Sequence, residues 1–221
     1  MSEFAISKIE TGQLNALVKN LMLQMGISDP QEAVRKINSG EWIVSKRARF
    51  WQEKDGVIYF SVTSDGTTGP EWIERLGKKG FQIEDYAKIL LRSDDFKPTS
   101  GVTYIITVLK GEMFFVNDRI TKNICAEADK KGFTKPNAEV ACLIRENFSD
   151  KEIKAMGLWW VVVMHEPIKD SVGDSGLLFT GRHGVGRWLF AHHCGGSYKW
   201  GRGDGFAFVV SQVPLEIHKI D

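Results

Sequence analysis

The sequence predicts an α+β protein in which a helical N-terminal arm precedes a mixed α/β segment and a strand-rich C-terminal domain. Three observations support this class. Apolar residues recur at helical spacing within residues 1–40, and β-branched residues crowd the run at 102–109. In the last third, glycine, arginine and tryptophan alternate with side chains that share no chemistry. Such a stretch is typical of neither a uniformly apolar core strand nor a catalytic site.

Composition limits the classes of function. The 221 residues suffice for one sizeable domain or a domain with a small companion. A net charge of +1 gives no overall field toward nucleic acid, so no nucleic-acid partner is expected. The longest apolar run, 158–164, is far too short to cross a bilayer, so no membrane insertion is expected.

The cysteines and the N-terminus indicate neither a metal site nor a signal peptide. Cys125, Cys142 and Cys194 are far apart and odd in number, so neither a disulfide framework nor a CxxC metal pair is predicted. Charges stand near the N-terminus where a signal peptide would carry an apolar run. We expect synthesis in the cytoplasm without a signal peptide, and the residues indicate no final location. No cofactor or metal is expected.

The arm, 1–40, is expected to hold two helices. Leu14, Val18, Leu21 and Met22 predict the first. The second begins at 29–32, where an aspartate can cap, a proline suits the first position and a glutamate can close a capping box.

The middle segment, 41–110, is expected to pack on the C-terminal core. Strands are predicted at 43–44, 50–51 and 57–62, the last two joined by a hairpin turn at 54–56. Helices are predicted at 69–80 and 83–91. The β-branched run at 102–109 predicts a further strand.

The C-terminal domain, 111–221, starts with helices at 118–131 and 136–146. A capping box of Ser149 and Glu152 opens a third helix. The apolar run at 158–164 predicts a buried strand, with the Trp159–Trp160 pair in the core. Beyond it the chain is rich in glycine and is expected to be irregular, with short strands predicted at 187–191 and 206–211.

Residues 177–205 and the strand after them carry a resemblance. The quoted residues are Met164 to Ile168, Asp170, Ser171, Gly186 to Leu189, Trp200, Arg202 and Gly205 to Val210. With the order of elements around them, these residues resemble the C-type-lectin-like fold. More narrowly, they are similar to the variable proteins of diversity-generating retroelements, which occur in bacteria, archaea and their viruses. The resemblance covers about residues 110–213.

The resemblance implies a genetic origin for the mixed side chains. In that family an error-prone reverse transcriptase copies a template repeat, misreads adenines and rewrites the 3′ part of the gene. Rewritten asparagine codons ending in a pyrimidine never encode Lys, Glu, Gln, Met or Trp. Between Phe179 and Asp204 only Trp188, Lys199 and Trp200 fall outside the permitted set, and no Asn follows Asn147. A template repeat and a reverse transcriptase are therefore expected nearby in the genome.

The resemblance implies ligand binding through a hypervariable surface, not catalysis, with an unknown protein or other macromolecule as partner. The expected contact residues are Phe179, Gly181, His183, Val185, Phe190, His192, His193, Gly195, Tyr198, Gly201 and Asp204, in a patch centred on Phe190, His193 and Tyr198. A scaffold must then supply stability without them. Its expected members are Gly186, Arg187, Trp188, Trp200, Gly205, Phe206 and Phe208, with the tryptophans and phenylalanines buried.

Some residues of this region also fit chemistries other than binding. His183, His192, His193 and Cys194 are zinc-ligand types, but adjacent His192 and His193 would point to opposite faces of a strand. His165 beside Glu166 could form an acid–base pair, although a histidine at a strand end more often makes a structural hydrogen bond.

The remaining alternatives rest on weaker patterns. Residues 169–174 resemble a calcium loop but lack its later glutamate, and the sugar-binding triplets of C-type lectins are missing. Sulfatase-activating oxidases share the lectin-like fold and use cysteine chemistry, yet only Cys194 lies near the site. The basic cluster 46–51 fits a solvated strand face better than a nucleic-acid contact. The second hypothesis is thus a metal-dependent lectin or an enzyme on the same fold.

Overall fold

The computed structural model describes residues 29–39, 51–170, 173–183, 186–193 and 198–210. The chain divides into two units, Met1–Ala48 and Arg49–Asp221. The described part of the first unit is helix α2 (Pro30–Asn38), and the Asp29 carboxylate accepts a hydrogen bond from the Gln31 N–H at its start (2.9 Å). The expected helix at 14–22, the strand at 43–44 and the basic cluster before residue 51 lie outside the described residues.

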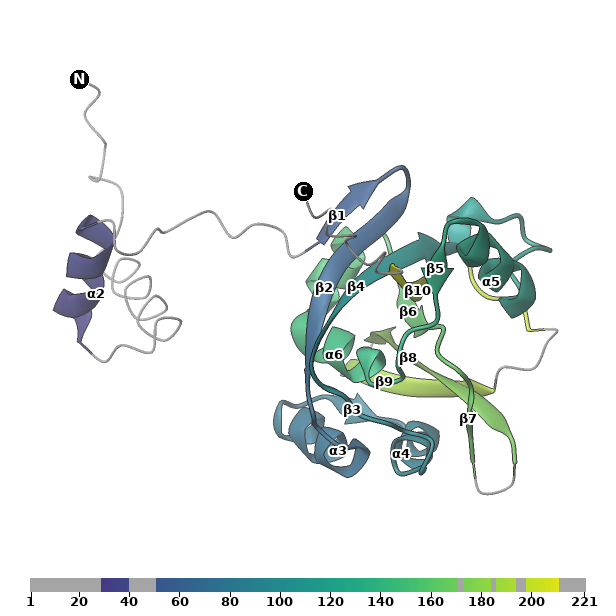
Figure 1. Cartoon of the computed structure of the whole chain (residues 1–221), viewed down its shortest axis with the longest axis horizontal. Helices are drawn as coiled ribbons and strands as arrows, with labels where there is room; N and C mark the ends of the chain where they lie inside the picture. The colour runs from purple at the N-terminus through teal and green to yellow at the C-terminus, as the bar shows by residue number, and fades with distance from the viewer. Residues whose placement is uncertain (1–28, 40–50, 171–172, 184–185, 194–197, 211–221) are drawn as a thin grey trace, which may run out of the picture. The chain divides into compact units, whose positions relative to one another are not determined.

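The second unit is built on a mixed sheet, in which ten strands are described (Figure 1). They are β1 (Trp51–Lys54), β2 (Val57–Asp65), β3 (Gln82–Ile83), β4 (Ser100–Lys110), β5 (Phe133–Thr134), β6 (Trp160–Val163), β7 (Ile168–Lys169), β8 (Ser175–His183), β9 (Gly186–His193) and β10 (Asp204–Val210). Their order is β1-β2-β4-β10-β6-β8-β9-β3, with β5 paired to β10 and β7 to β8. β10 runs parallel to β6 and β3 to β9, whereas the other pairs are antiparallel.

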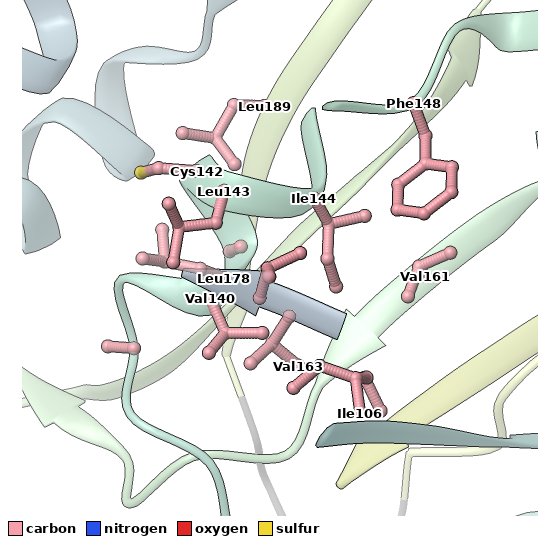
Figure 2. Packing of buried hydrophobic residues seen from close by; sticks show 14 of the residues in the cluster. Ile106, Val140, Cys142, Leu143, Ile144, Phe148, Val161, Val163, Leu178 and Leu189 are labelled. Atoms are coloured by element: carbon pink, nitrogen blue, oxygen red, sulfur yellow. The ribbon is translucent and has the colours of Figure 1, made fainter. Parts of the chain in front are cut away.

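Helices cover one face of this sheet. They are α3 (Gly69–Lys78), α4 (Asp85–Leu91), α6 (Val140–Asn147) and α7 (Asp150–Ala155). Figure 2 shows Val140 and Ile144 of α6 among Ile106 of β4 and Val163 of β6. The alternate residues of β8 and β9, including Leu178 and Leu189, join the same cluster and are fully buried. We call this side the helix-covered face.

On the opposite face, the described cover is helix α5 (Thr121–Lys130) and the segment before it. Helix α5 packs Ile124 and Ala128 against Phe206 and Phe208 of the central strand β10. A short 3-10 turn, η2 (Gly111–Met113), precedes α5. Among the described residues, no helix is both long and apolar enough to traverse a bilayer.

The α+β class is confirmed, and elements with local sequence signals lie where they were predicted. The hairpin turn forms at Asp55 and Gly56, whose φ angles of 52° and 76° are those a two-residue turn requires. Ser149 and Glu152 form the predicted capping box at the start of α7. Helices α5 and α6 begin three and four residues later than expected, at Thr121 and Val140.

Two expectations about strands were wrong. Strand β8 spans nine residues in a stretch predicted to be irregular. It is a strand because β6 and β9 pair with it on both sides, which local composition does not reveal. The side chain of Trp159 is 58% exposed instead of buried, and the guanidinium of Arg182 lies over its ring at 4.3 Å.

Candidate ligand-binding site

The half-exposed part of the sheet carries a set of aromatic side chains. Side chains alternate between the two faces of a strand, so Phe190 and His192 of β9 point away from the neighbours Leu189 and Ala191 that enter the core. Phe179 of β8 is the cross-strand partner of Phe190. We call this region the aromatic face and define it as Trp160, Phe179, Trp188, Phe190 and His192. All five side chains are half-buried.

The rings of the aromatic face are packed in a regular pattern. Phe179 and Phe190 are stacked, with centroids 5.3 Å apart and planes 14° apart. Trp160 meets both rings edge-on, at 5.5 and 5.2 Å. Trp188 stacks on the other side of Phe190 at 5.1 Å. Parallel and edge-on pairs at these distances are favourable, so the rings support one another while remaining partly open to solvent.

A pocket of about 460 Å³ lies over this face. The strands contribute Trp160, Val162, Phe179, Phe190 and His192 to its lining. The segment before β10 closes it with Tyr198, Lys199, Trp200 and Gly201, and β10 contributes its first residue, Asp204. Its size and its mainly aromatic lining, with a few polar groups at one side, are typical of ligand sites.

The segment 198–201 is held in place by the loop before α5. The backbone N–H of Trp200 donates to the Arg119 carbonyl (2.8 Å), and its indole N–H donates to the Thr121 hydroxyl (3.1 Å). The Lys199 ammonium donates to the side-chain carbonyl of Asn117 (2.9 Å). Trp200 is 5% exposed, as expected of a scaffold residue. Tyr198 is 41% exposed and meets the Trp200 ring edge-on at 4.8 Å.

Asp204 lines the pocket, as expected of a contact residue, but its side chain is buried and does not point outward. It is 8% exposed, and one carboxylate oxygen accepts a hydrogen bond from the Gly201 N–H at 2.6 Å. Burial raises the pKa of the Asp204 carboxyl, while the Gly201 bond and the charge of Arg119 oppose that rise. Asp204 therefore closes the 201–204 turn and presents a poorly hydrated acceptor to the pocket.

One of the three residues expected at the centre of the patch, His193, does not lie there. His193 points to the opposite face from Phe190, as strand alternation requires, and its ring stacks on Tyr86 of α4 at 4.4 Å. His192 takes the expected place instead, with its ring 4.1 Å from that of Tyr198. Its Nδ1–H donates to the His193 carbonyl (2.6 Å). The side chain of His183 and the residues Val185, Cys194 and Gly195 lie outside the described part of the chain.

Gly181, expected to be a contact residue, instead has a structural role. A Cβ atom there would collide with the Trp160 indole and with the Trp159 carbonyl, so no side chain fits. Its own carbonyl accepts a hydrogen bond from the fully buried guanidinium of Arg145 (3.1 Å). Gly181 thus lets β8 lie close enough to β6 for Trp160 to turn over the pocket.

The predicted scaffold residues have unequal surroundings. Phe206 and Phe208 are buried, and a Cβ at Gly205 would lie 2.6 Å from a methyl of Val108. Gly186 has a φ of 152°, which side chains rarely adopt. Arg187 is exposed, donates to the Lys79 carbonyl (3.0 Å) and stacks on Phe81, whereas Trp188 is half-buried, contrary to expectation.

Besides Trp200, an expected scaffold residue, three described pocket residues were not among the expected contact residues: Trp160, Val162 and Lys199. Trp160 contributes the largest side chain of the three. Strand alternation contained the signal, because two adjacent residues of one strand cannot both face the same core. Trp160 shares its face with Val162, which also lines the pocket.

The alternative chemistries find little support in the described residues. Both ring nitrogens of His165 are occupied by the backbone: Nδ1–H donates to the Glu166 carbonyl (2.6 Å), and Nε2 accepts from the Leu178 N–H (2.9 Å). This pairing requires a neutral ring, and burial lowers the His165 pKa to about 4. The structural interpretation of this histidine is therefore confirmed. Within the described ranges, no three His, Cys, Asp or Glu side chains lie close enough to share a metal ion.

The loop that resembles a calcium site makes a turn of its own. One Asp170 carboxylate oxygen accepts a hydrogen bond from the Asp174 N–H at 2.9 Å, and the Asp170 carbonyl accepts from the Gly173 N–H at 3.1 Å. The aspartate therefore holds the turn that leads from β7 into β8.

Comparisons with protein-family models, curated proteins and solved structures found no match for this chain. The lectin-like fold and the family resemblance consequently remain predictions that rest on the quoted residues.

Proposed function

We propose that this chain is a ligand-binding protein whose pocket surface is diversified by a retroelement on a C-type-lectin-like framework. One observation carries the proposal. Four positions expected to vary, Phe179, Phe190, His192 and Tyr198, line a single pocket. The residues that alternate with them on β8 and β9 are buried in the core.

This separation is what a diversified site requires. Substitutions on the pocket side remove partial contacts among half-buried rings, and substitutions at exposed positions usually change stability by about 0.5 kcal/mol. The core on the other side then keeps the strands paired whatever the pocket side chains are. A protein or other macromolecular partner fits such a surface, because aromatic and histidine side chains give contact area at a small cost in conformational entropy.

A pair of matched libraries tests the structural part of the proposal. One library randomises Phe179, Phe190, His192 and Tyr198, and the other randomises Leu178, Leu189, Ala191 and Phe206. We expect most members of the first library to remain soluble and protease-resistant and few members of the second to do so. Equal losses in both libraries would contradict the proposal.

The flanking DNA tests the genetic part. A near-copy of the 3′ end of the gene should lie close to a reverse-transcriptase gene, and the two copies should differ almost only at template adenines. Differences spread over all four template bases would exclude retroelement diversification.

A further inference from the structure

We infer that the pocket over the aromatic face binds an uncharged ring that carries a hydrogen-bond donor, and that its occupant is a tyrosine side chain of a protein partner. The inference rests on the proposed function and names the chemistry of its ligand. It follows from the division of the pocket into an apolar side, a polar side and the charges around them.

The apolar side fits the body of a ring. Trp160, Val162, Phe179 and Phe190 form it, and the Phe179 and Phe190 rings are parallel while Trp160 is perpendicular to both. A flat guest can stack on one ring and meet another edge-on, the two arrangements that aromatic groups prefer. A guest that covers these half-buried rings also removes apolar area from water.

The polar side fits a donor at the tip of that ring. The Asp204 carboxylate lines it and can only accept hydrogen bonds when ionised. The Gly201 N–H bonds one of its oxygens, and a carboxylate has room for about four such bonds. Because burial has already removed much of its water, a phenol hydroxyl directed at Asp204 would form a charge-assisted bond at little further desolvation cost.

The charges around the pocket favour a neutral guest. Lys199 lines the pocket, and the positive charge of Arg119 interacts with the Asp204 carboxylate. An ammonium or guanidinium guest would meet the Lys199 ammonium and a carboxylate whose charge Arg119 already partly offsets. A carboxylate or phosphate guest would meet Asp204 and the electron-rich faces of the rings.

A phenol also fits better than a sugar. A sugar ring presents several hydroxyl groups and needs polar partners around its edge. Here one N–H of Lys199 already donates to Asn117, and the Nδ1–H of His192 already donates to the His193 carbonyl. The described residues of the apolar side, Trp160, Val162, Phe179 and Phe190, carry no polar group apart from the Trp160 indole N–H.

The experiment is a titration of the full chain, followed by ¹H–¹⁵N NMR shifts, with 4-methylphenol as the probe. Toluene, 4-methylbenzylammonium and methyl glucoside are the comparison ligands. We expect 4-methylphenol to bind about tenfold more tightly than toluene, a ratio equal to one charge-assisted hydrogen bond of modest strength. The charged probe and the glycoside should bind more weakly than 4-methylphenol.

Variants assign the binding to this pocket. Trp160→Ala should abolish 4-methylphenol binding, and Asp204→Asn, which can still accept the Gly201 bond, should bring the preference over toluene close to unity. Trp159→Ala is the matched control, since that exposed tryptophan is not among the pocket residues, and it should leave binding unchanged.

Equal or tighter binding of toluene, the cation or the glycoside would overturn the inference, as would the absence of 4-methylphenol binding or its persistence in Trp160→Ala. The matched libraries decide the proposed function separately. A tolerant pocket library combined with no phenol preference would reject the tyrosine occupant alone.

Discussion

Strands β8 and β9 present two faces with opposite requirements. On the helix-covered face, Leu178 and Leu189 are fully buried among residues of α6 and β6. On the aromatic face, Phe179 and Phe190 belong to the same two strands but remain half-buried and line a pocket. One face holds the fold together while the other can serve recognition, because alternation separates the two roles by a single residue along the chain.

The largest effect should come from shortening a side chain on the helix-covered face. Leu178→Ala and Leu189→Ala should each lower the free energy of unfolding by about 2–5 kcal/mol, because each leaves a cavity in a close-packed core. Chemical denaturation monitored by circular dichroism measures this change. A loss below about 1 kcal/mol would mean that the two faces do not differ as described.

Acid should destabilise the protein through His165, whose ring bonds the backbone of Leu178 in β8. Its folded pKa of about 4 lies below the ordinary 6.5, so the unfolded chain takes up this proton first as the pH falls. The stability that the neutral ring supplies is complete above pH 6.5 and is lost toward pH 4, by about 3 kcal/mol in total. Denaturation curves at several pH values would show it.

The control for acid is a variant without the imidazole. Carboxyl groups elsewhere in the protein also take up protons as the pH falls. The test therefore compares wild type with His165→Gln, and the difference between their free energies of unfolding at each pH isolates the histidine. Parallel pH profiles for the two proteins would contradict the assignment of a neutral, backbone-bonded ring.

A methyl group added beneath the pocket should lower the free energy of unfolding by less than a core cavity does. Gly181→Ala should destabilise the protein by about 1–3 kcal/mol, since the new Cβ meets the Trp160 indole and the Trp159 carbonyl. The matched control is Gly77→Ala in α3, where nothing lies within 4 Å of the added atom. That change should be neutral or slightly stabilising in thermal melts.

The smallest effect should come from the rim of the pocket. Tyr198→Ala should change the free energy of unfolding by about 1 kcal/mol or less, because the ring is 41% exposed and loses only partial contacts with His192 and Trp200. Thermal melts measure this change. A cost as large as that of Leu189→Ala would place Tyr198 in the framework.

Elements with a local signal could be predicted from the sequence. The turn at Asp55 and Gly56, the capping box at Ser149 and the start of α2 each depend on residues within four positions of one another. Strand β8 could not be predicted in this way. Its residues include Gly176, Thr180 and Gly181, and pairing with β6 and β9 makes it a strand.

The candidate site, too, could be predicted only in part from the sequence. Phe179, Phe190, His192 and Tyr198 were named from the sequence as contact residues, and the structure gathers them at one pocket. Gly201 and Asp204, also expected contact residues, line the same pocket. His193 was misplaced because an unusual composition marks a segment without saying which side chains share a face. That information depends on strand register, which is set by distant partners.

The position of β10 has a consequence for synthesis. This strand lies between β4 and β6, in the middle of the sheet, yet it is encoded after residues 177–203. Until ribosomes have translated through that stretch in the correct reading frame, β4 and β6 lack the strand that joins them. A frameshift or premature stop within residues 177–203 would therefore remove the centre of the sheet, exposing unpaired strand edges of the kind that lead to aggregation and degradation. If the gene is rewritten as proposed, folding itself would select for intact copies.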